Sequence, residues 1–225
     1  MYRRFIENIF LFSKKNGAVV CGTRRSALVG GLLFGVGLTF MSSCSRPDFF
    51  VGTGGRYNEA NIELLRGRAA NLDKAIDNLQ VVVQNDPTYR DSLTLLGKAY
   101  YRKGRYYEAY SIIQRALAVN KGDEIAWLVL GLSQIRVGEN AKGLETIKGG
   151  LTLMTKAMKE DYRGYPGWDP RGTVRTSVNR SVFQALKGLE ERESLIQSTE
   201  QLLTRIDEEE WSQRQGKNLD RAVNE

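Results

Sequence analysis

Three arginine residues recur at a fixed interval along this chain. Arg68, Arg102 and Arg136 lie 34 residues apart, and Lys98 precedes Arg102 by about one helical turn. A guanidinium group donates two parallel hydrogen bonds to a carboxylate, so a row of arginines suits a ligand that carries carboxylates. Tyr101 would add an aromatic wall beside them. These five residues form the candidate binding site, and we expect its ligand to be a protein or peptide segment of acidic character.

A second interpretation is that these long basic side chains only keep helices solvated. Three of the four cations have no acidic residue three or four positions away, so ion pairs within a helix do not explain them. The fourth, Arg136, has Glu139 nearby. Acidic residues on neighbouring helices, such as Asp91 or Glu63, could still neutralise the row.

The residue types that most hydrolytic and metal chemistry requires are scarce. The 225 residues include no histidine and two cysteines, which excludes Ser-His-Asp and Cys-His nucleophiles, histidine-ligated zinc and cysteine-rich clusters. Adjacent acids such as Glu190 and Glu191 would point in different directions from a helix and share no pocket. We therefore expect no enzymatic activity, no metal site and no cofactor.

The positive charge is concentrated at the amino terminus. Of the net charge of +7, residues 1–43 carry +5, because six of the 33 basic residues but only one of the 26 acidic residues lie there. The remainder carries +2, with both signs well mixed. Nucleic-acid binding needs a basic face that displaces counterions, so we expect no nucleic-acid partner.

The amino terminus has the pattern of an export signal. The uncharged apolar run Ala27–Phe40 follows the pair Arg24 and Arg25 and precedes two serines and Cys44. Its 14 residues, four of them glycine, are fewer than the roughly 20 that a membrane-spanning helix needs. The basic flank stays inside during export, so the rest of the chain is expected outside the cytoplasm.

The segment Met41–Cys44 resembles a bacterial lipobox. This resemblance implies that residues 1–43 are a cleaved signal peptide and that Cys44 carries acyl chains of the palmitate type, which hold the protein in a membrane. Residues 44–56 would be a flexible tether. The implied location is the cell envelope facing the periplasm, in the outer rather than the inner membrane. The alternative is an uncleaved signal anchor in the inner membrane.

The body of the chain shows an internal period of 34 residues. One alignment sets a large residue, a leucine and a glycine of one row over those of the next, and a second sets small and bulky apolar residues in columns. The columns pair Leu93 with Trp127, Leu96 with Leu130, Gly97 with Gly131 and Tyr100 with Gln134, and they group Ala75, Ala109 and Gly143, and Leu79, Ile113 and Ile147.

This pattern resembles the tetratricopeptide repeat (TPR), which implies antiparallel helix pairs. The expected fold is all-α, a helix-turn-helix solenoid of about three TPR repeats over residues 57–157 with a long C-terminal capping helix. Small residues such as Gly97 and Gly131 would let two helices approach closely. Gly143 and Gly150 replace alanines of the pattern, which predicts looser packing of the last repeat's second helix.

Three further segments follow the repeats. Residues 158–172 are rich in glycine and aromatic residues and are expected to form a loop, in which Tyr165 and Trp168 either bind a partner or pack against the last repeat. Residues 173–215 predict one long helix or two stacked helices, broken only by Gly188, and residues 216–225 a tail. The charged second half could project, pair with another chain or lie solvated.

By resemblance to the family, the column of Arg102 and that of Lys98 face a concave groove that binds partner segments. The implied function is a membrane-anchored periplasmic TPR adaptor in envelope assembly, serving outer-membrane protein, pilus secretin or peptidoglycan-related machinery. The alternative is an inner-membrane, signal-anchored structural subunit of an export or respiratory complex. No residue distinguishes these pathways.

Overall fold

Short, regularly spaced helices make up the folded part of the chain. The computed structural model describes residues 52–159, 162 and 167–224, all of which belong to the compact unit Pro47–Glu225. Within this part there are eight α-helices, one short 3-10 helix and no strand. The predicted signal peptide, Cys44 with its lipobox, most of the tether and Tyr165 lie outside the described residues.

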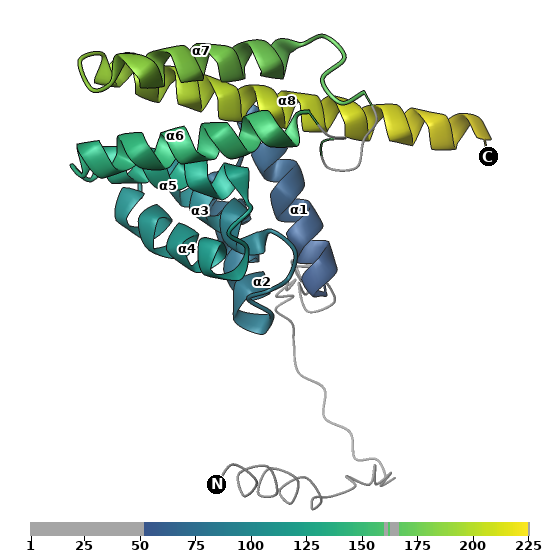
Figure 1. The fold of residues 1–225 in the computed structure, drawn as a ribbon. Helices are drawn as coiled ribbons and strands as arrows, with labels where there is room; N and C mark the ends of the chain where they lie inside the picture. Colours follow the sequence, from purple (N-terminus) through teal and green to yellow (C-terminus); the bar gives the residue numbers. More distant parts are fainter. Residues whose placement is uncertain (1–51, 160–161, 163–166, 225) are drawn as a thin grey trace, which may run out of the picture. The chain divides into compact units, whose positions relative to one another are not determined.

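The first six α-helices form three consecutive pairs (Figure 1). They are α1 (Thr53–Leu65), α2 (Leu72–Asn85), α3 (Ser92–Arg102), α4 (Tyr106–Val119), α5 (Glu124–Arg136) and α6 (Asn140–Ala157), with the 3-10 helix η2 (Gly67–Ala69) after α1. The expected all-α solenoid of helix pairs is confirmed. The first helix begins at Thr53, inside the segment predicted as a tether, because Arg56 N–H already bonds to the Gly52 carbonyl.

Local sequence signals set the ends of these helices. The Asn71 side chain accepts a hydrogen bond from Lys74 N–H at 3.1 Å, and Asp123 accepts one from Ala126 N–H at 2.9 Å, so each caps the start of a helix. Gly104 and Gly138 end α3 and α5 with φ of +81° and +97°, a conformation that glycine adopts without strain.

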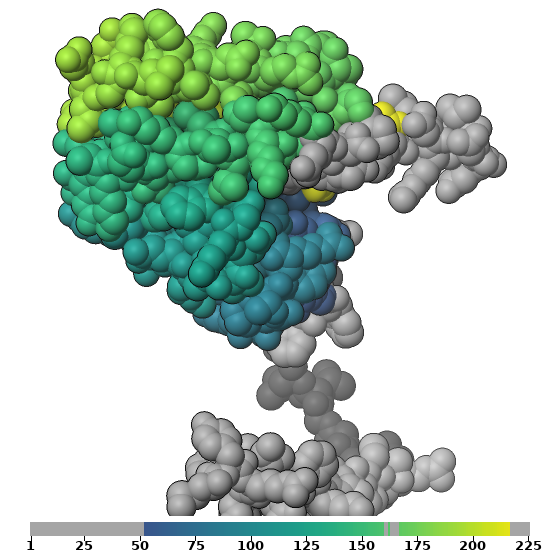
Figure 2. Space-filling model, viewed as in Figure 1, coloured from purple at the N-terminus to yellow at the C-terminus, as the bar shows by residue number. Residues whose placement is uncertain are grey.

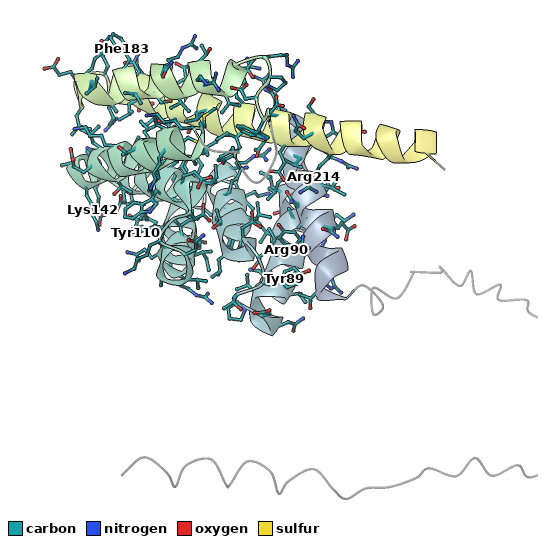
Figure 3. The ribbon with its side chains drawn as sticks, turned by 45° about the vertical axis from the view of Figure 1, so that its right-hand side comes forward. Tyr89, Arg90, Tyr110, Lys142, Phe183 and Arg214 are labelled. Atoms are coloured by element: carbon teal, nitrogen blue, oxygen red, sulfur yellow. The ribbon has the colours of Figure 1, made fainter. Side chains whose placement is uncertain are left out.

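The core lies between the helices of each pair and between successive pairs. Its largest fully buried side chains within the repeats are Leu64, Leu79, Leu96, Ile113, Leu128, Leu132, Ile147 and Met154. On the side of the second helices, Lys142 of α6 donates a hydrogen bond of 2.8 Å to the hydroxyl of Tyr110 on α4, which joins two repeats (Figure 3).

Packing of the third pair is tighter than the sequence predicted. The backbones of α5 and α6 meet at Gly131 and Gly143, where a Cβ added to Gly143 would lie 2.7 Å from the Gly131 carbonyl oxygen. The expectation of a looser α6 is therefore wrong. Glycine in place of alanine here permits a closer approach of the two helices rather than weakening it.

The segment after α6 folds back onto the repeats. Trp168 is buried, and its ring lies 4.3 Å from that of Tyr162, whose hydroxyl bonds to Glu124 of α5 at 2.6 Å. Of the two roles considered for Trp168, the structure shows packing against the last repeat. Asp169 then accepts hydrogen bonds from Val174 and Arg175 N–H and caps the next helix.

Two C-terminal helices complete the fold. They are α7 (Thr173–Lys187) and α8 (Arg192–Asn224), separated at Gly188, whose φ is +78°. Helix α7 packs on α6, while α8 packs along α7 and also contacts α5, α1 and η2 (Figure 1). From the side shown in Figure 2, α6 and α7 cover most of the middle of α8.

The carboxy-terminal predictions are met in part. Of the one or two helices expected after residue 173, the structure shows two. Helix α8 continues to Asn224, beyond residue 216 where a tail was predicted. Within the described ranges, no helix is long and apolar enough to cross a membrane.

Candidate functional site: a groove that α8 fills

Helices α3 and α5 carry four of the five predicted site residues, and together with α1 they form the surface that α8 contacts. Lys98, Tyr101 and Arg102 lie on α3, with Arg102 its last residue, and Arg136 is the last residue of α5. Arginine at these positions interacts favourably with the negative end of the helix dipole. Helix α8 lies across this surface, which we call the groove, and supplies the carboxylates that pair with it.

Lys98 is at the buried centre of the groove. Its ammonium group forms an ion pair and hydrogen bond with Asp207 of α8, and the two side chains keep only 7% and 11% of their surface exposed. Burial of either charge without its partner would be costly, because an unpaired charge would be left away from water. Lys98 was predicted to contact an acidic partner segment, and its contact in this structure is a carboxylate of its own chain.

Tyr101 and Arg136 share a second carboxylate. The Tyr101 hydroxyl donates to Glu200 Oε1 at 2.5 Å, and Arg136 Nη2 reaches the same oxygen at 3.2 Å. Arg136 also lies 3.8 Å from the carboxylate of Glu193. Burial and the bond to Glu200 raise the pKa of Tyr101, whereas partial burial of Arg136 is outweighed by Tyr101 and Glu200, which raise its pKa.

Arg102 has a different place from the one predicted. Its guanidinium donates to the carbonyl of Leu64 at 2.7 Å and to that of Gly67, so it holds the end of α1 and η2 instead of a carboxylate. Burial lowers the pKa of Arg102. Removal of Arg102 would therefore leave carbonyl groups at the end of α1 and in η2 without this donor.

Arg68 does not join the others. It lies exposed on η2, and the structure gives it no hydrogen bond or ion pair among the described residues. The interval of 34 residues therefore places three arginines at equivalent points of the sequence, but only Arg136 contacts carboxylates of α8. The acids considered as neutralising partners are engaged elsewhere, since Asp91 accepts from Tyr57 and Glu63 from Arg66.

The comparison with family models agrees with the helix pairs of this fold. Residues 68–132 match a family model described as tetratricopeptide repeat. A solved structure described as "Crystal structure of MamA" aligns with 72% of this chain and 82% of its own, at 21% identity and a TM-score of 0.46. No curated protein matches the sequence. The matched residues run from η2 into α5 and therefore include the α3 part of the groove.

Tetratricopeptide repeats generally mediate protein–protein contacts and typically serve as non-catalytic scaffolds. The described part of this chain holds no group of three or more metal-ligating side chains. Its charged residues at the groove form pairs across helices, and the carboxylates lie in a row rather than in a shared pocket.

The occupant of the groove was not identified from the sequence. Glu193, Glu200 and Asp207 are seven residues apart, so they lie along one side of α8, beside its buried residues Leu203 and Ile206. This seven-residue repeat of carboxylates was a signal in the sequence that could have indicated the helix that fills the groove. The acidic residues are opposite in charge to the row of basic residues and also recur at a regular interval, although the acidic and basic residues are about a hundred positions apart in the sequence.

Proposed function

We propose that this protein is a membrane-anchored periplasmic adaptor whose groove recognises acidic helical segments during envelope assembly. The observation that carries the proposal is the filled groove, where carboxylates of an amphipathic helix pair with Lys98, Tyr101 and Arg136. An internal helix bound in this way supports the proposal that a partner segment makes the same contacts. The anchor rests on the lipobox-like Met41–Cys44 of the sequence.

The anchor is tested by replacing Cys44 with alanine. The wild type should incorporate a fatty-acid probe and appear as the shorter, processed form. The variant should accumulate as an unlabelled, heavier precursor. Equal labelling and equal size of the two proteins would contradict the lipid anchor and favour an uncleaved signal helix.

Groove recognition is tested with a fluorescent peptide that spans residues 190–215. The receptor is the full chain in mild detergent, carrying Glu193→Gln, Glu200→Gln and Asp207→Asn, which we call the α8-amide variant. These changes weaken the internal helix but leave the groove intact. Fluorescence anisotropy should show binding, and the further changes Tyr101→Phe and Arg136→Gln should reduce it at least tenfold.

A matched control is Glu145→Gln, which removes an exposed carboxylate of α6 far from these contacts and should leave binding unchanged. Absence of peptide binding, in a variant whose α8 amides exchange rapidly with solvent, would overturn groove recognition. The lipid-anchor proposal would be unaffected by that result.

A further inference from the structure

Carboxylates one heptad apart on α8 meet the groove in succession. Seven residues of α-helix advance about 10.5 Å. Glu200 meets Arg136 of α5 and Tyr101 of α3, and Asp207, one heptad later, meets Lys98 of α3. A segment with one carboxylate per heptad is in register with the groove.

The contact of α8 with the groove includes ion pairs beside its apolar contacts. At one end, the side chains of Arg136, Glu200 and Glu193 keep 29%, 40% and 67% of their surface exposed, and such pairs contribute little to stability. At the other end, Glu209 is buried, and its Oε2 lies 3.8 Å from Nη2 of Arg171, whose side chain is largely exposed. An ion pair at this distance, with one partner largely exposed, contributes little to holding α8 in place.

The helices of the repeats pack against one another differently from the way α8 packs against the groove. Helices α5 and α6 meet backbone against backbone at Gly131 and Gly143, in a core that is mainly apolar but also buries polar residues such as Ser133 and Gln134. The contact of α8 with the groove combines apolar burial with separable ion pairs. The ion pairs fix the register of α8 on the groove. The backbone of α8 does not pack as closely against the groove as α5 packs against α6.

We infer that α8 is an internal competitor for the groove, and that the partner is an acidic amphipathic helix with carboxylates at seven-residue intervals that displaces it. This inference rests on the groove recognition proposed above. A partner with the same carboxylate spacing makes the same ion pairs as α8, so binding requires α8 to leave. The tethered helix then lowers the apparent affinity by the fraction of time that the groove is open.

Competition between identical segments has a quantitative consequence. A helix tethered to its own groove has an effective concentration of about a millimolar or more, so the wild-type chain should bind the peptide of residues 190–215 only in the millimolar range or more weakly. The α8-amide variant should bind the same peptide at least tenfold more tightly. Its matched control, Glu208→Gln, removes an exposed acid of α8 that pairs with Arg205 and should bind like the wild type.

Groove substitutions give a second and independent signature. In the wild type, Tyr101→Phe and Arg136→Gln weaken the binding of α8 to the groove and the binding of the added peptide equally. The apparent affinity for the peptide should therefore stay nearly constant. In the α8-amide variant the same substitutions should weaken peptide binding at least tenfold, because the internal helix has already lost the carboxylates. Circular dichroism of all variants should show retained helix.

The experiment is anisotropy with the full chain, combined with hydrogen exchange of the α8 amides. Tenfold tighter binding by the α8-amide variant, with faster exchange of α8, supports the inference. Equal affinity of the two chains, with binding still sensitive to the groove substitutions, overturns the inference and leaves the proposed function standing. If the α8 amides exchange slowly and the peptide does not bind, α8 is a permanent part of the fold, and that result also overturns the inference. Rapid exchange without binding contradicts the proposed function itself.

Discussion

Gly131 provides a sharp test of the helix register, because its replacement by alanine adds a single methyl group at the contact of α5 with α6. The new Cβ would lie 2.6 Å from Ile147 Cγ1, 2.8 Å from the Gly143 carbonyl oxygen and 2.9 Å from Ile147 N. Two of these three atoms belong to the backbone of α6, so no change of rotamer relieves the overlap. The helices must separate.

The magnitude follows from two opposing effects. Overpacking of this kind costs about 1–3 kcal/mol. Alanine is better than glycine inside a helix by about 1 kcal/mol. Because rigid backbone atoms take part in the contact, we expect Gly131→Ala to lower the free energy of unfolding by about 1–2 kcal/mol. For a domain of this size that corresponds to a fall in Tm of about 2–8 °C.

Gly149 is the matched control. It lies exposed on α6, and a Cβ added there would meet no atom within 4 Å. Gly149→Ala should therefore show the gain in helix propensity alone, about 0.5–1 kcal/mol of added stability. Thermal melts followed by circular dichroism compare the two variants with the wild type. A Gly131→Ala protein that melts at or above the wild-type temperature would refute the register of α5 against α6.

Three further changes test other parts of the fold. Gly97→Leu should destabilise the protein by about 1–3 kcal/mol in urea unfolding, because even a Cβ at Gly97 would lie 2.4 Å from the Ile113 side chain. Arg102→Lys should cost about 1–3 kcal/mol, since one ammonium group replaces a fork that serves two backbone carbonyls; unchanged unfolding would disprove that role. Burial raises the pKa of Asp123 above its unfolded value, so the wild type loses stability as pH rises through the folded pKa. Asp123→Asn, which keeps the cap, should equal or exceed wild-type stability at about pH 7, and that advantage should disappear at about pH 3, as measured by urea unfolding at both values.

The helix pairs could be predicted because their determinants are local and repeat. Gly97, Gly131 and Ala109 mark close approaches, and Gly104 and Gly138 mark turns, each at a fixed place in the 34-residue period. The tighter contact at Gly143 was missed because a glycine in place of alanine weakens an isolated helix, and only the partner backbone on α5 reverses the effect.

The sequence indicated that the candidate site would contact carboxylates, but it did not indicate which segment supplies them. The residue types of Lys98 and Arg136 indicated a carboxylate ligand, and carboxylates do lie against them. What the sequence did not show is that α8 folds back across the groove, because Lys98 and Asp207 are 109 positions apart and no periodicity joins them. Arg102 was assigned to the groove by its place in the period, while its real partners are carbonyl oxygens at the end of α1.

A double-mutant cycle between Lys98 and Asp207 tests the central claim most directly, that the basic groove of the repeats holds the acidic side of α8. The free energy of unfolding in urea is measured for the wild type, Lys98→Met, Asp207→Leu and the double variant. Each single change leaves one buried charge unpaired, so we predict a coupling energy of about 0.5–3 kcal/mol, with the double variant much more stable than the sum of the single losses implies. Additive losses, within about 0.3 kcal/mol, would show that the two residues do not meet and would contradict the placement of α8 in the groove.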